Sequence, residues 1–309
     1  MGRPVRLGLV GAGRLAEVGY LPAVEVARRA RIVAIADPDP DRRALLAGDE
    51  RPTYPSADAL LAAGGVDGIV VASPPATHEN VARLATGAGL PVLIEKPPAT
   101  DLAGAQRIAA LDPPPRIAFN RRFSLGLALE ACVPWSGSIE LELRYRRFSW
   151  SPVMVRDPAL LDLVPHLADL ALRAGIGKVR TVAARSARPE RVTITVDGDV
   201  GRARIACATD RFHLERAVVR RADGSVVAAN RAGGLLRGPL GRLRQGPHPL
   251  AASLAAQIDE FAAWCAGEPA IRLATAADGV AAMAIVGAAA ESLALGGEPV
   301  EPPATGVTA

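Results

Sequence analysis

The sequence predicts an α/β fold: an N-terminal Rossmann domain with a doubly wound parallel sheet, and a C-terminal α+β domain with an open, largely antiparallel sheet. Over residues 5–120, short apolar runs alternate with helical patterns, as in βαβ units. From Ser138 onward the runs are longer and are joined by tight turns such as Asp197-Gly198, which is typical of antiparallel strands. Because 309 residues can bury two cores, we expect two domains, 1–120 and 121–309.

The expected elements follow from the apolar runs in chain order. In the N-terminal part, with helices between them, the expected strands are 5–10, 31–36, 68–73, 91–95 and 116–119. In the C-terminal part the expected strands are 138–148, 179–186, 190–197, 200–208 and 211–220. A loop rich in glycine and arginine is expected over 231–247, followed by helices near 249–266 and 275–295.

Composition and charge argue against several classes of protein. Half of the residues are hydrophobic and 22% are charged, which is ordinary for a soluble globular protein. The net charge is +4 and the arginines are scattered, so we expect no nucleic-acid partner. The most apolar stretch, 279–295, is alanine-rich and interrupted by Glu291, so we expect a packed helix and no membrane contact.

The cysteines and the N-terminus bear on localisation. Cys132, Cys207 and Cys265 are far apart and form no CxxC pair, so we expect neither a disulfide framework nor a metal site. The short apolar run near the N-terminus leads directly into a glycine motif and is expected to be a strand, not a signal peptide. These features favour the cytoplasm.

A glycine turn follows the first expected strand. Val5–Val10 runs into Gly11-Ala12-Gly13-Arg14-Leu15-Ala16 and then a helix, so that a dinucleotide pyrophosphate can approach backbone N–H groups. The second strand ends in Asp37, placed to accept hydrogen bonds from the adenosine ribose. Asp37 without an adjacent arginine favours NAD, whereas Arg42 and Arg43 leave NADP possible.

One lysine stands out. Of 36 basic residues only Lys96 and Lys178 are lysines. Lys96 lies in Glu95-Lys96-Pro97 at the end of strand 91–95, on the carboxyl edge where open α/β sheets bind ligands. Its ammonium can donate a hydrogen bond to a substrate oxygen or take part in proton transfer. The alternative interpretation is a surface lysine at a strand end.

A third group of candidates spans residues 162–169. Pro165 suits the first position of a helix, which places His166 in the first helical turn. The helix N-terminus disfavours a cationic imidazole, so His166 is expected to be neutral and able to accept a proton, with Asp169 one turn on to orient it. The alternative is a histidine that caps a core helix.

Together these motifs resemble those of the glucose-fructose oxidoreductase and inositol dehydrogenase family of NAD(P)-dependent enzymes. The likeness extends to Ser73-Pro74-Pro75 with His78, to Phe119-Asn120-Arg121-Arg122-Phe123 and to the last long helix. The resemblance implies that the catalytic group is Lys96, Asp162 and His166. In oxidation His166 removes the proton of a substrate hydroxyl while the adjoining carbon passes hydride to the nicotinamide, and Lys96 and Asp162 hold that oxygen and its neighbour.

Motif and resemblance together give a set of binding residues. The expected cofactor contacts are Gly11, Gly13, Arg14, Leu15, Asp37, Ser73, Pro74, His78, Glu95, Lys96 and Asn120. The expected substrate contacts are Lys96, Arg122, Asp162 and His166. For the loop after strand 68–73 and for Asn120 a local role is the alternative, since Thr77 can cap a helix and Asn120 can end a strand.

Two departures from the family pattern leave the substrate open. Val164 stands where family members usually carry glycine, and Asp157-Pro158-Ala159-Leu160 replaces a Gly-Gly pair, so a narrower pocket is expected. The leading expectation is a sugar, cyclitol or related polyol. The alternatives are a non-sugar carbonyl or imine, or a non-catalytic NAD(P)-binding regulator. Because one face of an open sheet needs cover, we also expect a homodimer or homotetramer.

Overall fold

The computed structural model describes residues 3–48, 51–124, 137–146, 158–221, 223–232 and 249–305. The chain divides into two compact units: Met1–Phe123 with Pro247–Gly279 and Val307–Ala309 in the first, and Ser124–Gly246 with Val280–Gly306 in the second. Some positions used in the sequence analysis lie outside the described residues. They are Cys132, Asp157, residues 147–148 of a predicted strand and residues 233–247 of the predicted loop.

The first unit contains a seven-stranded sheet in the order β13-β6-β5-β4-β1-β2-β3. Its strands are β1 (Val5–Val10), β2 (Ala30–Ala36), β3 (Thr53–Tyr54), β4 (Gly68–Val71), β5 (Val92–Glu95), β6 (Arg116–Ala118) and β13 (Ala274–Thr275). All pair in parallel except β13, which is antiparallel to β6. The predicted doubly wound Rossmann sheet is confirmed, and its strand order reverses between β1 and β4, the point where such sheets bind ligands.

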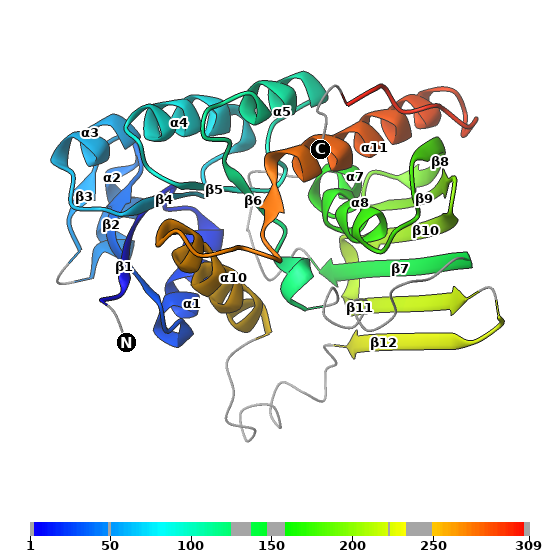
Figure 1. Cartoon of the computed structure of the whole chain (residues 1–309), viewed down its shortest axis with the longest axis horizontal. Helices are drawn as coiled ribbons and strands as arrows, with labels where there is room; N and C mark the ends of the chain where they lie inside the picture. Colours follow the sequence, from blue (N-terminus) through cyan, green and yellow to red (C-terminus); the bar gives the residue numbers. More distant parts are fainter. Residues whose placement is uncertain are drawn as a thin grey trace. The chain divides into compact units, whose positions relative to one another are not determined.

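Helices cover both sides of this sheet, with α4 and α5 on one side and α1 and α10 on the other (Figure 1). The helical segments are η1 (Ala16–Tyr20), α1 (Leu21–Val26), α2 (Pro40–Ala47), α3 (Ala57–Ala63), α4 (Pro75–Gly87), α5 (Leu102–Ala109), η2 (Asn120–Phe123) and α10 (Pro249–Cys265). Side chains of Asp39, Ser56 and Asp101 cap α2, α3 and α5. Strands β4 and β5 are buried along their whole length, as strands covered on both faces must be.

Helix α10 marks a difference from the predicted division at residue 120. It belongs to the first unit, where it contacts η1, α1 and η2. Leu254, Ile258 and Phe261 of this helix are almost fully buried. Its apolar face packs against the helix that follows the glycine turn, a contact across more than 200 residues of sequence that no local pattern announces.

The second unit contains a six-stranded sheet in the order β12-β11-β7-β10-β9-β8. Its strands are β7 (Gly137–Arg146), β8 (Val179–Arg188), β9 (Arg191–Gly198), β10 (Gly201–Ala208), β11 (Asp210–Arg221) and β12 (Val226–Ala232). All pairs are antiparallel except β7 with β10. The predicted open, largely antiparallel sheet is confirmed. Strand β12 was not predicted, and its last two residues, 231–232, were wrongly placed in the loop.

Short helices pack on this sheet. Helices α7 (Ala159–Asp162) and α8 (Val164–Arg173) contact β7, β9 and β10. Ile139, Leu141 and Leu143 of β7 are buried, whereas Glu140 and Glu142 between them are partly exposed. This alternation is the pattern of a sheet that packs on one face and leaves the other open.

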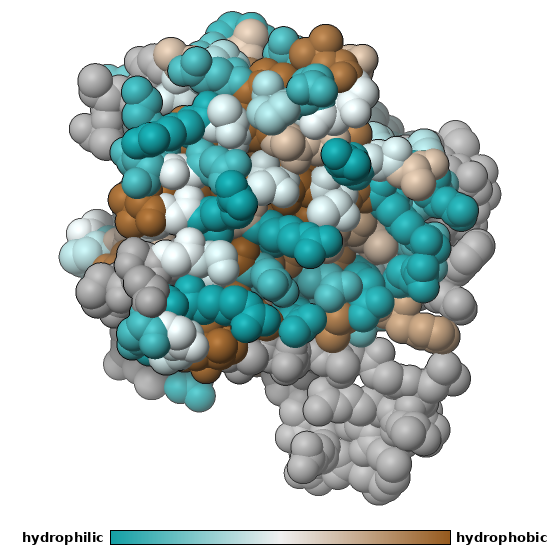
Figure 2. Space-filling view, turned by 90° about the vertical axis from the view of Figure 1, so that its right-hand side faces the viewer, coloured by the Kyte–Doolittle hydropathy of each residue, from teal (hydrophilic) through white to brown (hydrophobic). Residues whose placement is uncertain are grey.

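Helix α11 (Ala276–Ala294) is the one helix in the described part of the chain whose length and composition would allow it to cross a membrane. Yet 61% of its apolar window is buried within the fold, as in a core helix. On the face in Figure 2, hydrophobic residues are scattered among hydrophilic ones, which is typical of a surface that faces water.

Candidate active site

The glycine turn between β1 and η1 has two glycines with different surroundings. Gly11 has φ +105°, and a Cβ there would lie 2.6 Å from the backbone of Ala72 and Ser73 at the end of β4. A Cβ on Gly13 would meet nothing within 4 Å. Gly11 is therefore needed by the fold itself, whereas Gly13 leaves open space beside the backbone, which fits the approach of a pyrophosphate group.

The helix after the turn begins without a side-chain cap among the described residues, so no capping side chain competes there with an anionic ligand, while the Glu17 N–H donates to the Gly13 carbonyl at 3.2 Å. Arg14 lies at this start, half exposed, and its Nη1 donates to Glu17 Oε1 at 2.7 Å. This hydrogen bond is the main cause of the lowered pKa of Glu17, to which Arg42 also contributes. Leu15, the other predicted contact in the turn, is partly buried.

Asp37 at the end of β2 is tied to the glycine turn. Its Oδ2 accepts a hydrogen bond from the Ala12 N–H at 2.7 Å, and its Oδ1 accepts one from the Asp39 N–H at 2.9 Å. A carboxylate can accept about four hydrogen bonds, so the half-buried Asp37 keeps acceptor capacity for ribose hydroxyls. Arg42 Nε donates to the Ala12 carbonyl at 2.9 Å and Arg43 Nη1 to the Asp37 carbonyl at 2.6 Å, which occupies part of both guanidinium groups.

The loops after β4 and β5 are joined by His78. Its Nε2 lies 2.8 Å from the Ser73 carbonyl oxygen and its Nδ1 lies 3.1 Å from the Pro98 carbonyl oxygen. The ring is completely buried, and burial lowers its pKa. His78 thus holds two loops at the carboxyl edge of the sheet. Of the predicted contacts in the first loop, Ser73 is partly exposed and Pro74 is exposed.

Glu95 and Lys96 lie at the same edge, at the end of β5. Glu95 is 6% exposed, and its Oε1 accepts a hydrogen bond from the Tyr20 hydroxyl at 2.6 Å. Its Oε2 accepts one from the backbone N–H of Lys96 at 3.1 Å, while the Lys96 side chain is partly exposed. Burial raises the pKa of both Glu95 and Tyr20. Sequence reasoning missed Tyr20, because 75 residues separate it from Glu95.

Two further predicted residues are buried in the first unit. Asn120 is 5% exposed, and its Nδ2 donates to Ser253 Oγ of α10 at 3.4 Å. Arg122 is 4% exposed, donates to the Arg272 carbonyl and forms an ion pair with Asp278 at 3.1 Å. These contacts join η2 to segments near the C-terminus. The cofactor role of Asn120 and the substrate role of Arg122 stay predictions.

The second unit places Asp162 and His166 close together in sequence and structure. Asp162 ends α7, and His166 lies in the first turn of α8, after Pro165 as predicted. His166 and Asp169 are 5% and 2% exposed, so both face the protein interior. The Tyr145 hydroxyl of β7 donates a hydrogen bond to Asp162 Oδ2, a contact that the sequence did not reveal. Lys96 belongs to the other unit, and its membership of one catalytic group with Asp162 and His166 stays a prediction.

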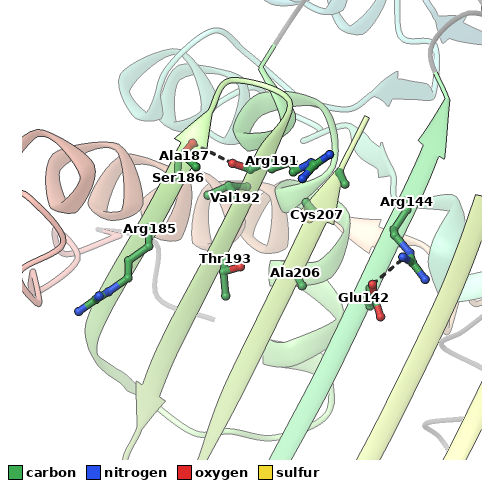
Figure 3. A pocket seen from close by; sticks show the side chains of 11 residues that line it. Glu142, Arg144, Arg185, Ser186, Ala187, Arg191, Val192, Thr193, Ala206 and Cys207 are labelled. Atoms are coloured by element: carbon green, nitrogen blue, oxygen red, sulfur yellow. Dashed lines mark hydrogen bonds and ion pairs between the residues drawn. The ribbon is translucent and has the colours of Figure 1, made fainter. Parts of the chain in front are cut away.

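A cavity of about 490 Å³ lies elsewhere on the second unit. In Figure 3 the side chains of Glu142, Arg144, Arg185 and Thr193 point away from the helices behind the sheet. The cavity therefore belongs to the open face and includes none of the predicted site residues. No group of three or more potential metal-binding side chains occurs in the residues that the structure describes.

The strand order, the glycine turn and Asp37 define a Rossmann protein built to bind a dinucleotide. Residues 5–112 match the model of an oxidoreductase family with an NAD-binding Rossmann fold. This match confirms, for the N-terminal part of the chain, the resemblance to the glucose-fructose oxidoreductase and inositol dehydrogenase family.

Individual relatives point the same way. The chain is 34% identical over 200 residues to an inositol 2-dehydrogenase from Acidothermus cellulolyticus. This alignment covers 59% of this chain and 58% of the relative. The chain is 44% identical over 92 residues to the rhizopine catabolism protein MocA from Rhizobium meliloti, across 30% of this chain and 29% of the relative. The matched segments therefore span less than two thirds of these relatives.

Solved structures extend the likeness of fold to the whole chain. The myo-inositol dehydrogenase from Lactobacillus casei, solved with NAD(H) and myo-inositol, superposes with a TM-score of 0.81 over 99% of both chains at 18% identity. An oxidoreductase from Agrobacterium radiobacter, solved with NAD+, L-tartaric acid and magnesium, gives a TM-score of 0.77 over 97% of this chain and 98% of the other at 21% identity. Both units therefore have the fold of these two proteins.

Proposed function

We propose that this chain is an NAD(P)-dependent oxidoreductase that transfers hydride between the nicotinamide and a secondary alcohol or ketone of a sugar, cyclitol or related polyol. The observation that carries the proposal is the common location of four features at the carboxyl edge of the parallel sheet: the open turn at Gly13, the Asp37 carboxylate, the Ser73 loop and Lys96. The similarity to proteins named inositol 2-dehydrogenase supports a cyclitol-like substrate.

In this mechanism the chain's own residues handle the proton. The bound nicotinamide supplies the hydride acceptor. His166 accepts the proton of the substrate hydroxyl through its imidazole, while Lys96 and Asp162 hold that oxygen and its neighbour. Tyr145, which donates to Asp162, keeps this carboxylate oriented. In the reductive direction His166 returns the proton.

NAD is the proposed cofactor of choice. A 2′-phosphate would approach the Asp37 carboxylate, and two negative charges in close contact repel each other. If NADP were the cofactor, the positive charges of Arg42 and Arg43 would have to offset this repulsion. Their hydrogen bonds to the carbonyls of Ala12 and Asp37 reduce their freedom to do so.

The proposal includes an assembly and a compartment. The open face of the second unit's sheet is buried against another copy of the chain, in a homodimer or homotetramer. The cysteines that the structure describes, Cys207 and Cys265, are free thiols, which is compatible with the reducing cytoplasm.

A turnover assay with a lysine variant tests the proposed function. The purified protein is incubated with NAD and a panel of inositols, sugars and polyols, and NADH formation is followed. Lys96→Ala should lower kcat by about 100-fold or more, because the ammonium acts on the substrate oxygen, and should weaken NADH binding far less, because the other predicted cofactor contacts remain. Lys178, the only other lysine of the chain, is exposed. The variant Lys178→Ala therefore serves as the matched control.

Each other outcome has a distinct meaning. Turnover only with a non-sugar carbonyl or imine would favour the second candidate, for which the buried Val164 in place of glycine is the motivating feature. NADH binding without turnover of any compound would favour a regulator. Full activity of Lys96→Ala would contradict the proposed mechanism.

A further inference from the structure

A buried polar pair in the first unit has no part in the mechanism above. Tyr20 lies on η1, the first helical segment after the glycine turn, and is completely buried. Glu95 ends β5 and is 6% exposed. The Tyr20 hydroxyl donates to Glu95 Oε1 at 2.6 Å, and the Lys96 N–H donates to Oε2 at 3.1 Å. One carboxylate therefore bridges the helix of the glycine turn and the backbone of Lys96.

Burial makes this pair costly, so its location needs a reason. A carboxyl group loses its hydration when buried, and a phenylalanine with an apolar partner would fill the same space without that loss. Burial raises the pKa of Glu95, whereas the Tyr20 hydroxyl and the charges of Lys96 and Arg121 favour its ionised form. The side chain of Gln257 of α10, which is uncharged and completely buried, also acts on the Tyr20 hydroxyl.

We infer that Tyr20 is a positioning residue for Lys96. Its hydroxyl holds Glu95 in place, and Glu95 in turn fixes the backbone of Lys96. This inference rests on the proposed function for its effect on turnover. Its effect on the Lys96 backbone does not depend on that function.

Loss of the Tyr20 hydroxyl should loosen this link. Tyr20→Phe removes one hydrogen bond to the Glu95 carboxylate, so the pKa of Glu95 rises and its ionised form is less populated. The hydrogen bond from the Lys96 N–H to that carboxylate then weakens, and the Lys96 amide opens to solvent more often. Glu95→Gln removes the charge altogether and should act in the same direction with a larger effect.

Hydrogen exchange measures this effect without any substrate. Peptide mass spectrometry follows the exchange of the Lys96 amide, which donates to Glu95, and of the Lys178 amide, which donates to Asp199 in the other unit. Tyr20→Phe should speed the exchange of the Lys96 amide by about threefold or more and leave that of Lys178 unchanged. Unchanged exchange of the Lys96 amide in both variants would overturn the inference.

The turnover assay adds a second readout. In Tyr20→Phe we expect kcat to fall by about tenfold and the Kd for NADH to change less than about twofold. The matched control is Thr86→Val, which removes another buried hydroxyl of the same unit, one that donates to carbonyls within α4. If both variants fold and show the same kcat and the same Kd for NADH, the Tyr20 hydroxyl has a structural role only.

The two proposals can fail separately. A wild-type protein that turns over no substrate, but in which Tyr20→Phe speeds the exchange of the Lys96 amide, would contradict the proposed function and support the link. An active wild-type enzyme with unchanged amide exchange and unchanged kcat in Tyr20→Phe would do the reverse.

Discussion

Two glycines of one turn are required for different reasons. The Cβ of an alanine at position 11 would lie 2.6 Å from backbone atoms of Ala72 and Ser73, and φ is +105°. Backbone cannot give way as a flexible side chain can, so Gly11→Ala should destabilise the fold by about 2 kcal/mol or more. At Gly13 the added Cβ meets nothing within 4 Å. Gly13→Ala should therefore leave stability within about 1 kcal/mol and instead weaken NADH binding, because the methyl group enters the space of the pyrophosphate.

Chemical denaturation and NADH titration of both variants check this contrast. Gly11→Ala should show the lower free energy of unfolding, and Gly13→Ala the higher Kd relative to its stability. Equal losses of stability in both variants would contradict the contrast between the two glycines. Wild-type NADH affinity of Gly13→Ala would show that Gly13 does not face the cofactor.

Residues in local motifs could be predicted, and residues in tertiary contacts could not. Asp37 was found because a strand end has a fixed distance from the glycine turn, and the structure places its carboxylate on the Ala12 N–H. Tyr20 and Tyr145 donate to Glu95 and Asp162 from other elements, so only the fold reveals them. His78 was noticed from its spacing, but its burial between two carbonyl groups depends on the packing of two loops.

At the scale of elements, the six-stranded sheet has one open face. Helices α7 and α8 pack on its other face, while Arg204 and the neighbouring outward side chains of β7, β9 and β10 are wholly or partly exposed. The open face carries both acidic and basic groups, so two copies can pair it with complementary charges. We expect static light scattering to give the mass of a dimer or tetramer.

A charge reversal locates that interface. Arg204→Glu should shift the wild-type oligomer toward the monomer, whereas Arg83→Glu, an exposed reversal on α4, should leave the mass unchanged. A monomeric wild-type protein would contradict the proposed assembly.

The elements themselves were largely predictable, with informative exceptions. Short apolar runs identified the parallel strands except β3, which has only two residues, and longer patterns identified both late helices. Strand β13 has only two residues and exists because it pairs with the edge strand β6, which the local sequence does not encode. The place of α10 in the first unit likewise depends on its burial against η1 and α1.

For the molecule as a whole, the proposed functions divide between the two units. The glycine turn, Asp37, the Ser73 loop and Lys96 belong to the first unit, whereas Asp162 and His166 belong to the second. Cofactor recognition is therefore assigned to one compact unit, and the proton acceptor to the other. We propose that the first unit binds NAD and recognises its ribose through Asp37.

Calorimetric titration of the wild-type protein with NADH and, in parallel, with NADPH tests that claim most directly. We predict a Kd for NADH at least about tenfold lower than for NADPH, because a 2′-phosphate beside the Asp37 carboxylate costs electrostatic energy. A preference for NADPH would transfer the role of Asp37 to Arg42 or Arg43. Binding of neither dinucleotide would contradict the account.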